Sequence, residues 1–327
     1  MQYTTLGRTG VKVSRLCFGA MSFGGDADEQ TSAAMFARCR DAGINFFDCA
    51  DIYNRGRSEE ILGSLAASCR DRLVLTTKVF GPMSDDPNDR GLSRRHIMLA
   101  AEASLRRLNT DRIDVYFCHT FDSAPAMEET LRAMDDLVRQ GKVLYPAVSN
   151  WTAWQVEKAL GISARMNLAR FECLQPMYNL VKRQAEVEIL PMATAEGLGV
   201  IPYSPLGGGL LTGKYGVGRR PVAGRVVKNE MYKLRYADPA CFETADRLTQ
   251  FAAARGVHPA TLAVAWVMHN PAVTAPIIGA RNLDQLEPSL AAAELDMTAE
   301  LRAEISALSP EPPVATDRAE EKTKSMW

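Results

Sequence analysis

Four residues of complementary chemistry stand at the ends of apolar, strand-like stretches or just beyond them. Asp48, Lys78 and His119 each end such a stretch, and Tyr53 follows shortly after Asp48. A phenol with an unperturbed pKa of about 10 is a poor acid catalyst at neutral pH, but a neighbouring ammonium favours the phenolate and improves the proton donor. We therefore expect Lys78 to lower the pKa of Tyr53, and Asp48 to keep Lys78 charged and oriented.

The imidazole of His119 completes a set that could protonate an oxygen as it gains negative charge. It would donate a hydrogen bond that positions and polarises a carbonyl oxygen. A carbonyl oxygen becomes an alkoxide when hydride reaches its carbon, and protein side chains supply no hydride, whereas a nicotinamide does. The set therefore predicts a nicotinamide cofactor and a small-molecule carbonyl substrate, with no metal.

The elements that must position these groups alternate along the chain. Amphipathic helical patterns, such as 93–108 after Ser93, 128–140 and one from near Leu262, separate the strand-like runs. Such alternation favours parallel strands with right-handed crossovers, and eight units of this length suit a closed (β/α)₈ TIM barrel. The strand candidates are 15–20, 44–48, 73–78, 113–119, 143–149, 171–176, 199–205 and 274–279.

An open doubly wound sheet is the alternative α/β architecture. It should carry G-x-G-x-x-G after its first strand, and the glycines at 19, 24 and 25 do not have that spacing. Without linkers or repeats, residues 1–309 are predicted to form one barrel domain that opens with an N-terminal β-hairpin, and 310–327 a Pro- and charge-rich C-terminal tail. The long loop after strand seven, 216–239, is expected to act as a lid or clamp.

In a barrel the active site lies at the carboxyl ends of the strands, and further polar groups stand there. Ser149, Asn150 and Gln175 offer hydroxyl and amide groups for a carboxamide, and Tyr203 offers a ring face for a nicotinamide. The same ends also present Ser204, Gly279 and Arg281.

Composition excludes several classes of partner. The chain has 38 basic and 39 acidic residues, a net charge of −1, and no basic block, so we expect no nucleic acid partner. No signal peptide and no apolar run of about 20 residues is present, which predicts a cytoplasmic protein without a membrane segment. The seven Cys residues include no C-x-x-C pair, so disulfides and structural zinc are not expected.

The stretch GGLLTGKY, residues 208–215, is close to the phosphate-loop pattern of nucleotide hydrolases. That pattern requires Ser or Thr after the Lys, because the hydroxyl ligates magnesium, and Tyr215 stands there instead. The stretch is therefore interpreted as a loop that holds phosphate without cleaving it.

Ordered segments along nearly the whole chain resemble the aldo-keto reductases, most closely the bacterial and potassium-channel-β-like branch. They include FDCADIYNRGRSEEILG, FCHTFD, VSNW, QPMYNLVKRQAEVEILP, YSPLGGGLLTGKY and IIGARNLDQLEPSLAA. The resemblance implies a (β/α)₈ barrel, NADPH bound without a Rossmann motif, and a catalytic tetrad of Asp48, Tyr53, Lys78 and His119, with Tyr53 as proton donor.

The same resemblance implies which residues contact the cofactor. Ser149, Asn150 and Gln175 would hold the carboxamide and Tyr203 would stack on the ring. Arg281 and Gln285 would reach the 2′-phosphate. A contact between the guanidinium of Arg281 and this phosphate favours NADPH over NADH, because NADH lacks the phosphate. Ser204, Leu206, Gly208 and Lys214 would line the pyrophosphate.

Two positions depart from the family pattern. Pro288 and Ser289 replace an acidic residue followed by Asn, which affects the expected adenine contacts. Pro146 is expected to interrupt strand five and to cost a ladder hydrogen bond.

The sequence says less about the substrate than about the fold or the cofactor. Phe23, Phe80, Phe121 and Trp151, with the tail ending at Trp327, are the predicted pocket residues and would suit a hydrophobic aldehyde. The sequence specifies neither the natural substrate, nor the reaction direction, nor the oligomeric state. A redox-sensing subunit of the channel-β type is the alternative function, although Met1 lies almost at the hairpin and leaves no N-terminal arm for a partner.

Overall fold

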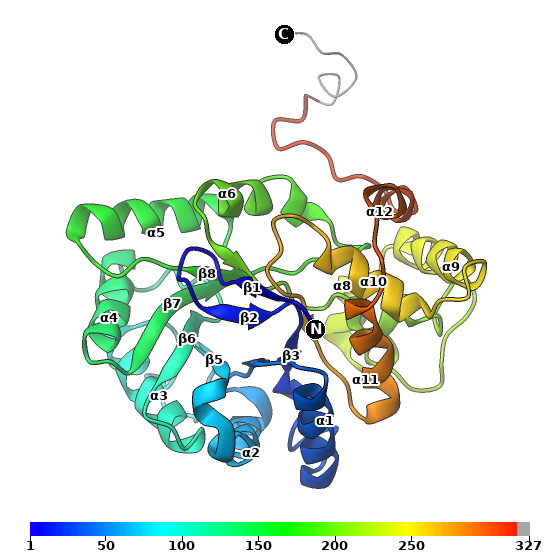
Figure 1. Cartoon of the computed structure of the whole chain (residues 1–327). Coiled ribbons are helices and arrows are strands. Elements are labelled where there is room, and N and C mark those ends of the chain that lie inside the picture. The colour runs from blue at the N-terminus through cyan, green and yellow to red at the C-terminus, as the bar shows by residue number, and fades with distance from the viewer. Residues whose placement is uncertain (319–327) are drawn as a thin grey trace.

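Eight parallel strands follow one another around a single sheet in the computed structural model, which describes residues 1–318 (Figure 1). Every neighbouring pair is parallel, and the order along the sheet is β10-β3-β4-β5-β6-β7-β8-β9. The strands are β3 (Cys17–Gly19), β4 (Phe46–Asp48), β5 (Val74–Val79), β6 (Ile113–Cys118), β7 (Val143–Ser149), β8 (Cys173–Gln175), β9 (Gly199–Val200) and β10 (Ile277–Ile278).

Backbone hydrogen bonds join the two ends of this sheet. The N–H of Thr274 donates to the carbonyl of Val200 over 2.8 Å, and the N–H of Ile277 donates to that of Pro202 over 2.9 Å. The chain at β10 therefore pairs with the chain at β9, and the sheet closes on itself. The predicted (β/α)₈ barrel is confirmed. Seven of the eight predicted strands contain one observed strand each, and β5 extends one residue beyond the predicted 73–78.

Helices surround the barrel (Figure 1). They are α1 (Glu29–Asp41), α2 (Arg57–Ala66), α3 (Arg94–Arg107), α4 (Met127–Arg139), α5 (Ala153–Met166), α6 (Ile189–Ala195), α7 (Arg225–Lys228), α8 (Glu230–Arg235), α9 (Pro239–Ala253), α10 (Pro259–Met268), α11 (Leu283–Leu290) and α12 (Ala299–Ser306). The 3₁₀ helices are η1 (Ala20–Ser22), η2 (Tyr53–Gly56), η3 (Ala67–Arg72), η4 (Gln184–Glu186), η5 (Gly207–Thr212) and η6 (Ala291–Ala293).

Local capping explains where two of these helices begin. The hydroxyl of Ser93 accepts from the N–H of His96 over 3.2 Å, so α3 starts as predicted. Helix α10 begins at Pro259 rather than near Leu262, because proline needs no amide donor in a first turn and His258 caps the helix.

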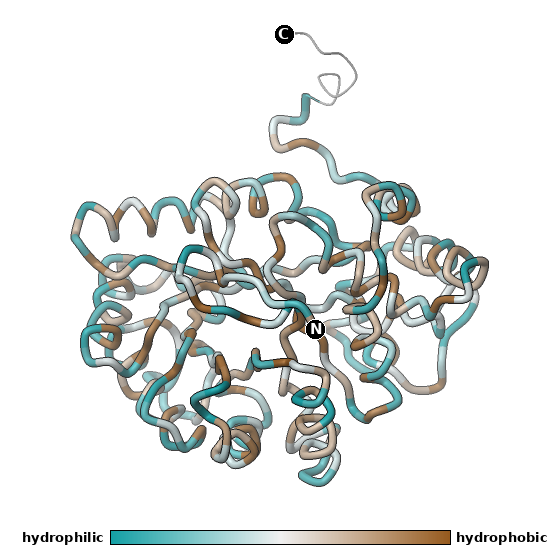
Figure 2. The backbone as a smooth tube through the Cα atoms, in the orientation of Figure 1, coloured by the Kyte–Doolittle hydropathy of each residue, from teal (hydrophilic) through white to brown (hydrophobic). Residues whose placement is uncertain are grey.

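The core has two layers, one inside the barrel and one between barrel and helices. Inside, strand residues such as Phe46 and Phe117 pack with Leu6 and Val13 of the antiparallel hairpin of β1 (Tyr3–Thr5) and β2 (Lys12–Ser14). Figure 2 shows hydrophobic and hydrophilic stretches alternating along the surrounding helices, as expected where a helix buries one face.

Strand β7 runs without a break through Pro146, contrary to the sequence-based expectation. Pro146 lies opposite Tyr116 of β6, and its carbonyl accepts from the N–H of Glu172 over 3.0 Å. Pairing with β8 begins only where Ala147 faces Cys173. The missing N–H of the proline therefore falls ahead of the paired stretch, and no ladder hydrogen bond is lost.

The predicted lid segment 216–239 contains α7 and α8 and is attached to α9. The side chain of Asp246 accepts from the N–H of Val217 over 2.6 Å and from the guanidinium of Arg219 over 2.9 Å.

In the tail, 310–318 forms neither helix nor strand, and Trp327 lies outside the described residues. None of the helices in residues 1–318 combines the length and apolarity needed to cross a bilayer.

Candidate active site

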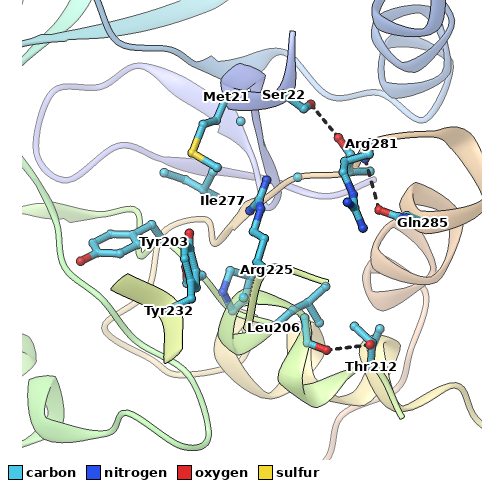
Figure 3. A pocket seen from close by; sticks show the side chains of 18 of the residues that line it. Met21, Ser22, Tyr203, Leu206, Thr212, Arg225, Tyr232, Ile277, Arg281 and Gln285 are labelled. Atoms are coloured by element: carbon cyan, nitrogen blue, oxygen red, sulfur yellow. Dashed lines mark hydrogen bonds between the residues drawn. The ribbon is translucent and has the colours of Figure 1, made fainter. Parts of the chain in front are cut away.

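A cavity of about 630 Å³ opens at the carboxyl ends of the strands (Figure 3). Asp48, Tyr53 and His119 line it, and Lys78 lies fully buried behind them. All of the predicted cofactor contacts also line this cavity: Ser149, Asn150, Gln175, Tyr203, Ser204, Leu206, Gly208, Lys214, Gly279, Arg281 and Gln285. The barrel thus brings together groups from the ends of seven strands, β4 to β10, that are far apart in the sequence.

A buried ion pair forms the floor of the cavity. The Nζ of Lys78 lies 2.6 Å from Oδ2 of Asp48 and donates to the carbonyl of Cys49 over 2.6 Å. Oδ1 of Asp48 accepts from the hydroxyl of Thr76 over 2.6 Å and from the amide of Gln175 over 2.9 Å. Burial is the largest single effect and would lower the pKa of Lys78, but the neighbouring groups, Asp48 foremost, together outweigh it and raise that pKa. The ammonium is therefore held charged in one orientation.

The phenol of Tyr53 lies within reach of this ammonium. The Nζ of Lys78 is 3.5 Å from the Tyr53 hydroxyl and 5.0 Å from the centroid of its ring. Burial nevertheless raises the pKa of Tyr53 to about 12, although Lys78 acts in the opposite direction. The expected effect of Lys78 is present, but loss of water outweighs the nearby charge, so the pKa of Tyr53 is raised rather than lowered. At neutral pH the hydroxyl keeps its proton and can donate it.

The imidazole of His119 faces the ring of Tyr53 edge-on. Their centroids are 6.0 Å apart and the ring planes meet at 82°. Burial lowers the pKa of His119 to about 3, and the charge on Lys78 lowers it further. The ring is therefore neutral near pH 7, and one of its nitrogens can donate a hydrogen bond without transferring a proton.

Asn150 connects the loops after β6, β7 and β9. Its Nδ2 donates to the carbonyl of His119 over 2.9 Å and to the hydroxyl of Ser149 over 3.1 Å. The hydroxyl of Tyr203 donates to its Oδ1 over 2.7 Å. Its backbone has a φ of 60°, a left-handed conformation that Asn tolerates better than most residues. The predicted carboxamide contacts and the predicted stacking ring therefore belong to one hydrogen-bonded unit.

A strained turn positions Tyr53. Asn54 and Arg55 follow it with φ values of 48° and 54°. Nδ2 of Asn54 donates to the carbonyls of Met21 over 3.1 Å and Phe23 over 2.7 Å. These bonds tie the Tyr53 turn to the loop after β3 and offset the cost of the left-handed pair.

Residues 15–310 match the family model described as the Aldo/keto reductase family. The chain belongs to the aldo/keto reductase family. It is 39% identical over 304 residues to a protein of Arabidopsis thaliana called a probable voltage-gated potassium channel subunit beta, covering 90% of this chain and 92% of that protein.

Two further relatives carry oxidoreductase names. The uncharacterized oxidoreductase YrpG of Bacillus subtilis is 39% identical over 335 residues, covering 98% of this chain and 99% of its own. The norsolorinic acid reductase of Aspergillus flavus is 32% identical over 344 residues, covering 97% and 86% respectively. The relatives therefore include proteins named as oxidoreductases and a protein named as a probable channel subunit.

Three cations lie near one another in the lining of the cavity of this aldo/keto reductase. Lys214, Arg225 and Arg281 all line it and make no ion pair with a carboxylate of residues 1–318. Burial lowers the pKa of Lys214, and the charges of Arg281 and Arg225 lower it further. Figure 3 shows both arginines directed into the cavity. Such a group of unpaired cations fits a ligand with several phosphates.

Arg225 was not among the residues predicted from the sequence. It belongs to the 216–239 segment, whose unusual length and basic residues were the only signal for it. Its helix, α7, does not directly follow the end of a strand, so the rule that places site residues at strand ends does not point to it. Only folding of the segment over the cavity brings Arg225 to the other two cations.

A glycine allows the segment to pack closely over the cavity. Gly208 has a φ of 67°, and a Cβ placed on it would lie 2.6 Å from the ring of Tyr232. The rings of Tyr232 and Tyr236 stack with centroids 6.4 Å apart.

Lys214 of the phosphate-loop-like stretch reaches the cavity, whereas Tyr215 is fully buried. In residues 1–318 no cluster of His, Cys, Asp or Glu has the form of a metal site.

The predicted substrate-pocket residues do not line this cavity. Phe23 is fully buried, with its ring centroid 5.6 Å from that of Phe18, and so does not reach this cavity. Phe80, Phe121 and Trp151 pack against the core instead, the last two edge to face at 5.0 Å. Side chains that sequence reasoning missed take their place, namely Met21, Met231, Tyr232 and Arg235. Pro288, one of the two adjacent residues that differ from the family pattern, also lines the cavity.

Proposed function

We propose that this aldo/keto reductase reduces an aldehyde or ketone to an alcohol with NADPH as cofactor. One observation carries the proposal: a buried Asp48–Lys78 pair lies beneath a protonated Tyr53 and a neutral His119. This arrangement suits proton donation to an oxygen that is gaining negative charge.

The residues of the cavity fit the cofactor. Ser149, Asn150 and Gln175 provide the polar groups for a carboxamide, beside the ring of Tyr203. The unpaired cations Lys214, Arg225 and Arg281 suit its phosphates, with Arg281 and Gln285 assigned to the 2′-phosphate. When bound, the reduced nicotinamide supplies the hydride.

The protein side chains supply the rest of the chemistry. His119 donates a hydrogen bond to the carbonyl oxygen and orients it toward Tyr53. The hydroxyl of Tyr53 gives its proton to that oxygen, and the ammonium of Lys78 stabilises the phenolate that is left. Asp48 keeps Lys78 charged throughout. In the oxidative direction the same phenolate would accept the proton.

The proposal is tested by NADPH consumption with an aromatic aldehyde, comparing wild type with Tyr53→Phe and running NADH in parallel. Loss of a general acid typically costs 10²- to 10⁴-fold in rate, so kcat should fall by about 100-fold or more. The Kd for NADPH, measured by nicotinamide fluorescence, should stay within about twofold. A variant that keeps most of its kcat would contradict the mechanism.

A regulatory role is the second candidate. It is favoured by the 39% identity to the protein named as a probable voltage-gated potassium channel subunit beta. NADPH binding without turnover of a broad aldehyde panel would support this role over the enzymatic one.

A further inference from the structure

We infer that Arg235 selects substrates that carry a carboxylate as well as the aldehyde or ketone. This inference rests on the proposed carbonyl reduction. Arg235 is the last residue of α8 and lines the same cavity as Tyr53 and His119. It is a half-buried cation beyond the three already assigned to the cofactor phosphates.

Arg225 and Arg235 both lie near the ring of Tyr232. The guanidinium of Arg225 lies 6.0 Å from the centroid of this ring, and that of Arg235 lies 5.1 Å from it. Arg225 also acts electrostatically on Lys214, as Arg281 does, whereas Arg235 does not. Arg225 and Arg235 of the lid segment therefore serve different parts of the cavity.

Arg235 lies toward the catalytic part. Arg235 and Tyr203 line the same cavity, and the guanidinium of Arg235 opposes the rise that burial causes in the pKa of Tyr203. The hydroxyl of Tyr203 donates to Asn150, and Asn150 donates to the carbonyl of His119. One hydrogen-bonded chain thus leads from the surroundings of Arg235 to the residue that would hold the reacting carbonyl.

The charge of Arg235 is not neutralised within residues 1–318. Its guanidinium forms no ion pair there, and its hydrogen-bonding contact is the sulfur of Met231 at 3.6 Å. By contrast, Lys233 on the same helix pairs with Glu230. A guanidinium presents a planar fork that matches a carboxylate with two parallel hydrogen bonds. A carboxylate on the substrate would supply the missing partner.

The reaction itself is unchanged by this contact. The carbonyl carbon gains the hydride of the reduced nicotinamide, the C=O π electrons move to oxygen, and that oxygen takes the proton of Tyr53. The carboxylate is neither oxidised nor reduced, and serves only to bind and orient the substrate.

Two aldehydes of nearly the same shape test the inference. 4-Carboxybenzaldehyde carries the carboxylate, and methyl 4-formylbenzoate replaces it with a neutral ester. We expect wild type to show a kcat/KM at least about tenfold higher for the acid, as a charge-assisted hydrogen bond would give. Arg235→Met should remove this preference, mainly through KM, and leave the ester's kcat/KM within about twofold. The control Lys233→Met, which removes a paired charge from the same helix, should keep the preference.

The outcomes separate the inference from the proposed function. Equal reduction of acid and ester by wild type would overturn the role of Arg235 and leave carbonyl reduction standing. A weaker Kd for NADPH in Arg235→Met, with the acid preference retained, would place the guanidinium on the cofactor and also overturn the inference. If neither aldehyde consumed NADPH, the proposed function would fail, and this inference with it.

Discussion

Replacement of Asp48 by Asn should destabilise the protein strongly, because it leaves a charged Lys78 buried without its counter-ion. The Lys78 side chain is 0% exposed and that of Asp48 3%. Removing one partner of a buried pair costs about 3–5 kcal/mol. The carbonyl of Cys49 would remain as an acceptor for the ammonium, but it carries no compensating charge.

This loss converts to a measurable shift in Tm. With an unfolding entropy of about 2.1 cal/mol/K per residue, a chain of 327 residues unfolds with about 0.69 kcal/mol/K. A loss of 3–5 kcal/mol therefore lowers Tm by about 4–7 °C. Circular dichroism or calorimetry measures the shift, with urea unfolding as an independent check.

A double-mutant cycle isolates the pair from the other hydrogen bonds of Asp48. Lys78→Met leaves the carboxylate unpaired, and the double variant leaves no buried charge. The double variant should lose less stability than the sum of the two single variants, by about 1–3 kcal/mol. Additive losses, or a Tm shift below about 2 °C for Asp48→Asn, would refute the reasoning.

The pH dependence of Asp48→Asn provides a second readout. Burial is the largest effect on Lys78, and without Asp48 it would hold the pKa of the folded state below the unfolded value of about 10.4. The folded variant would then bind fewer protons than the unfolded chain, so its stability should rise as pH increases through the folded pKa toward 10.4. Wild type should show no such gain, because its Lys78 pKa is raised.

Two further predictions concern His119 and Gly208. Because the pKa of His119 is lowered to about 3, it contributes stability above about pH 6.5 that is lost as pH falls toward 3, and His119→Gln should flatten this part of a stability–pH curve. A break in log kcat near pH 6.5 that His119→Gln abolishes would contradict a neutral imidazole. Gly208→Ala should cost about 1–2 kcal/mol for its left-handed backbone and also weaken NADPH binding, because the new Cβ displaces Tyr232. Gly141→Ala, with a φ of 72° and open space around it, should share the stability loss but leave the Kd unchanged.

Much of the site could be predicted because a barrel imposes a simple spatial rule. Alternating strands and helices place every strand's carboxyl end on one face, so residue type and position at those ends already place Asp48, His119 and Gln175 together. The cofactor contacts could be named for the same reason, with the added resemblance in ordered segments. These inferences need only local sequence and one topological rule.

The side chains that do not stand at strand ends were predicted poorly. Phe23 follows η1, and whether such a ring enters the core or a pocket depends on neighbours such as Phe18 that sequence spacing does not identify. Arg225 and Arg235 belong to a segment whose path over the cavity is decided by its attachment to Asp246 and its contact at Gly208. These are contacts between distant parts of the chain.

The sequence by itself determined the barrel, the family and the types of the catalytic groups, because periodicity and the order of motifs are local properties. Tertiary structure alone decided how those groups ionise. A charge beside Tyr53 predicted a lowered pKa, yet burial of the phenol reverses that direction. Pro146 is tolerated for a similar reason, since its cost depends on where the neighbouring strand begins. Burial and strand pairing are set by the whole fold, and no short stretch of sequence contains them.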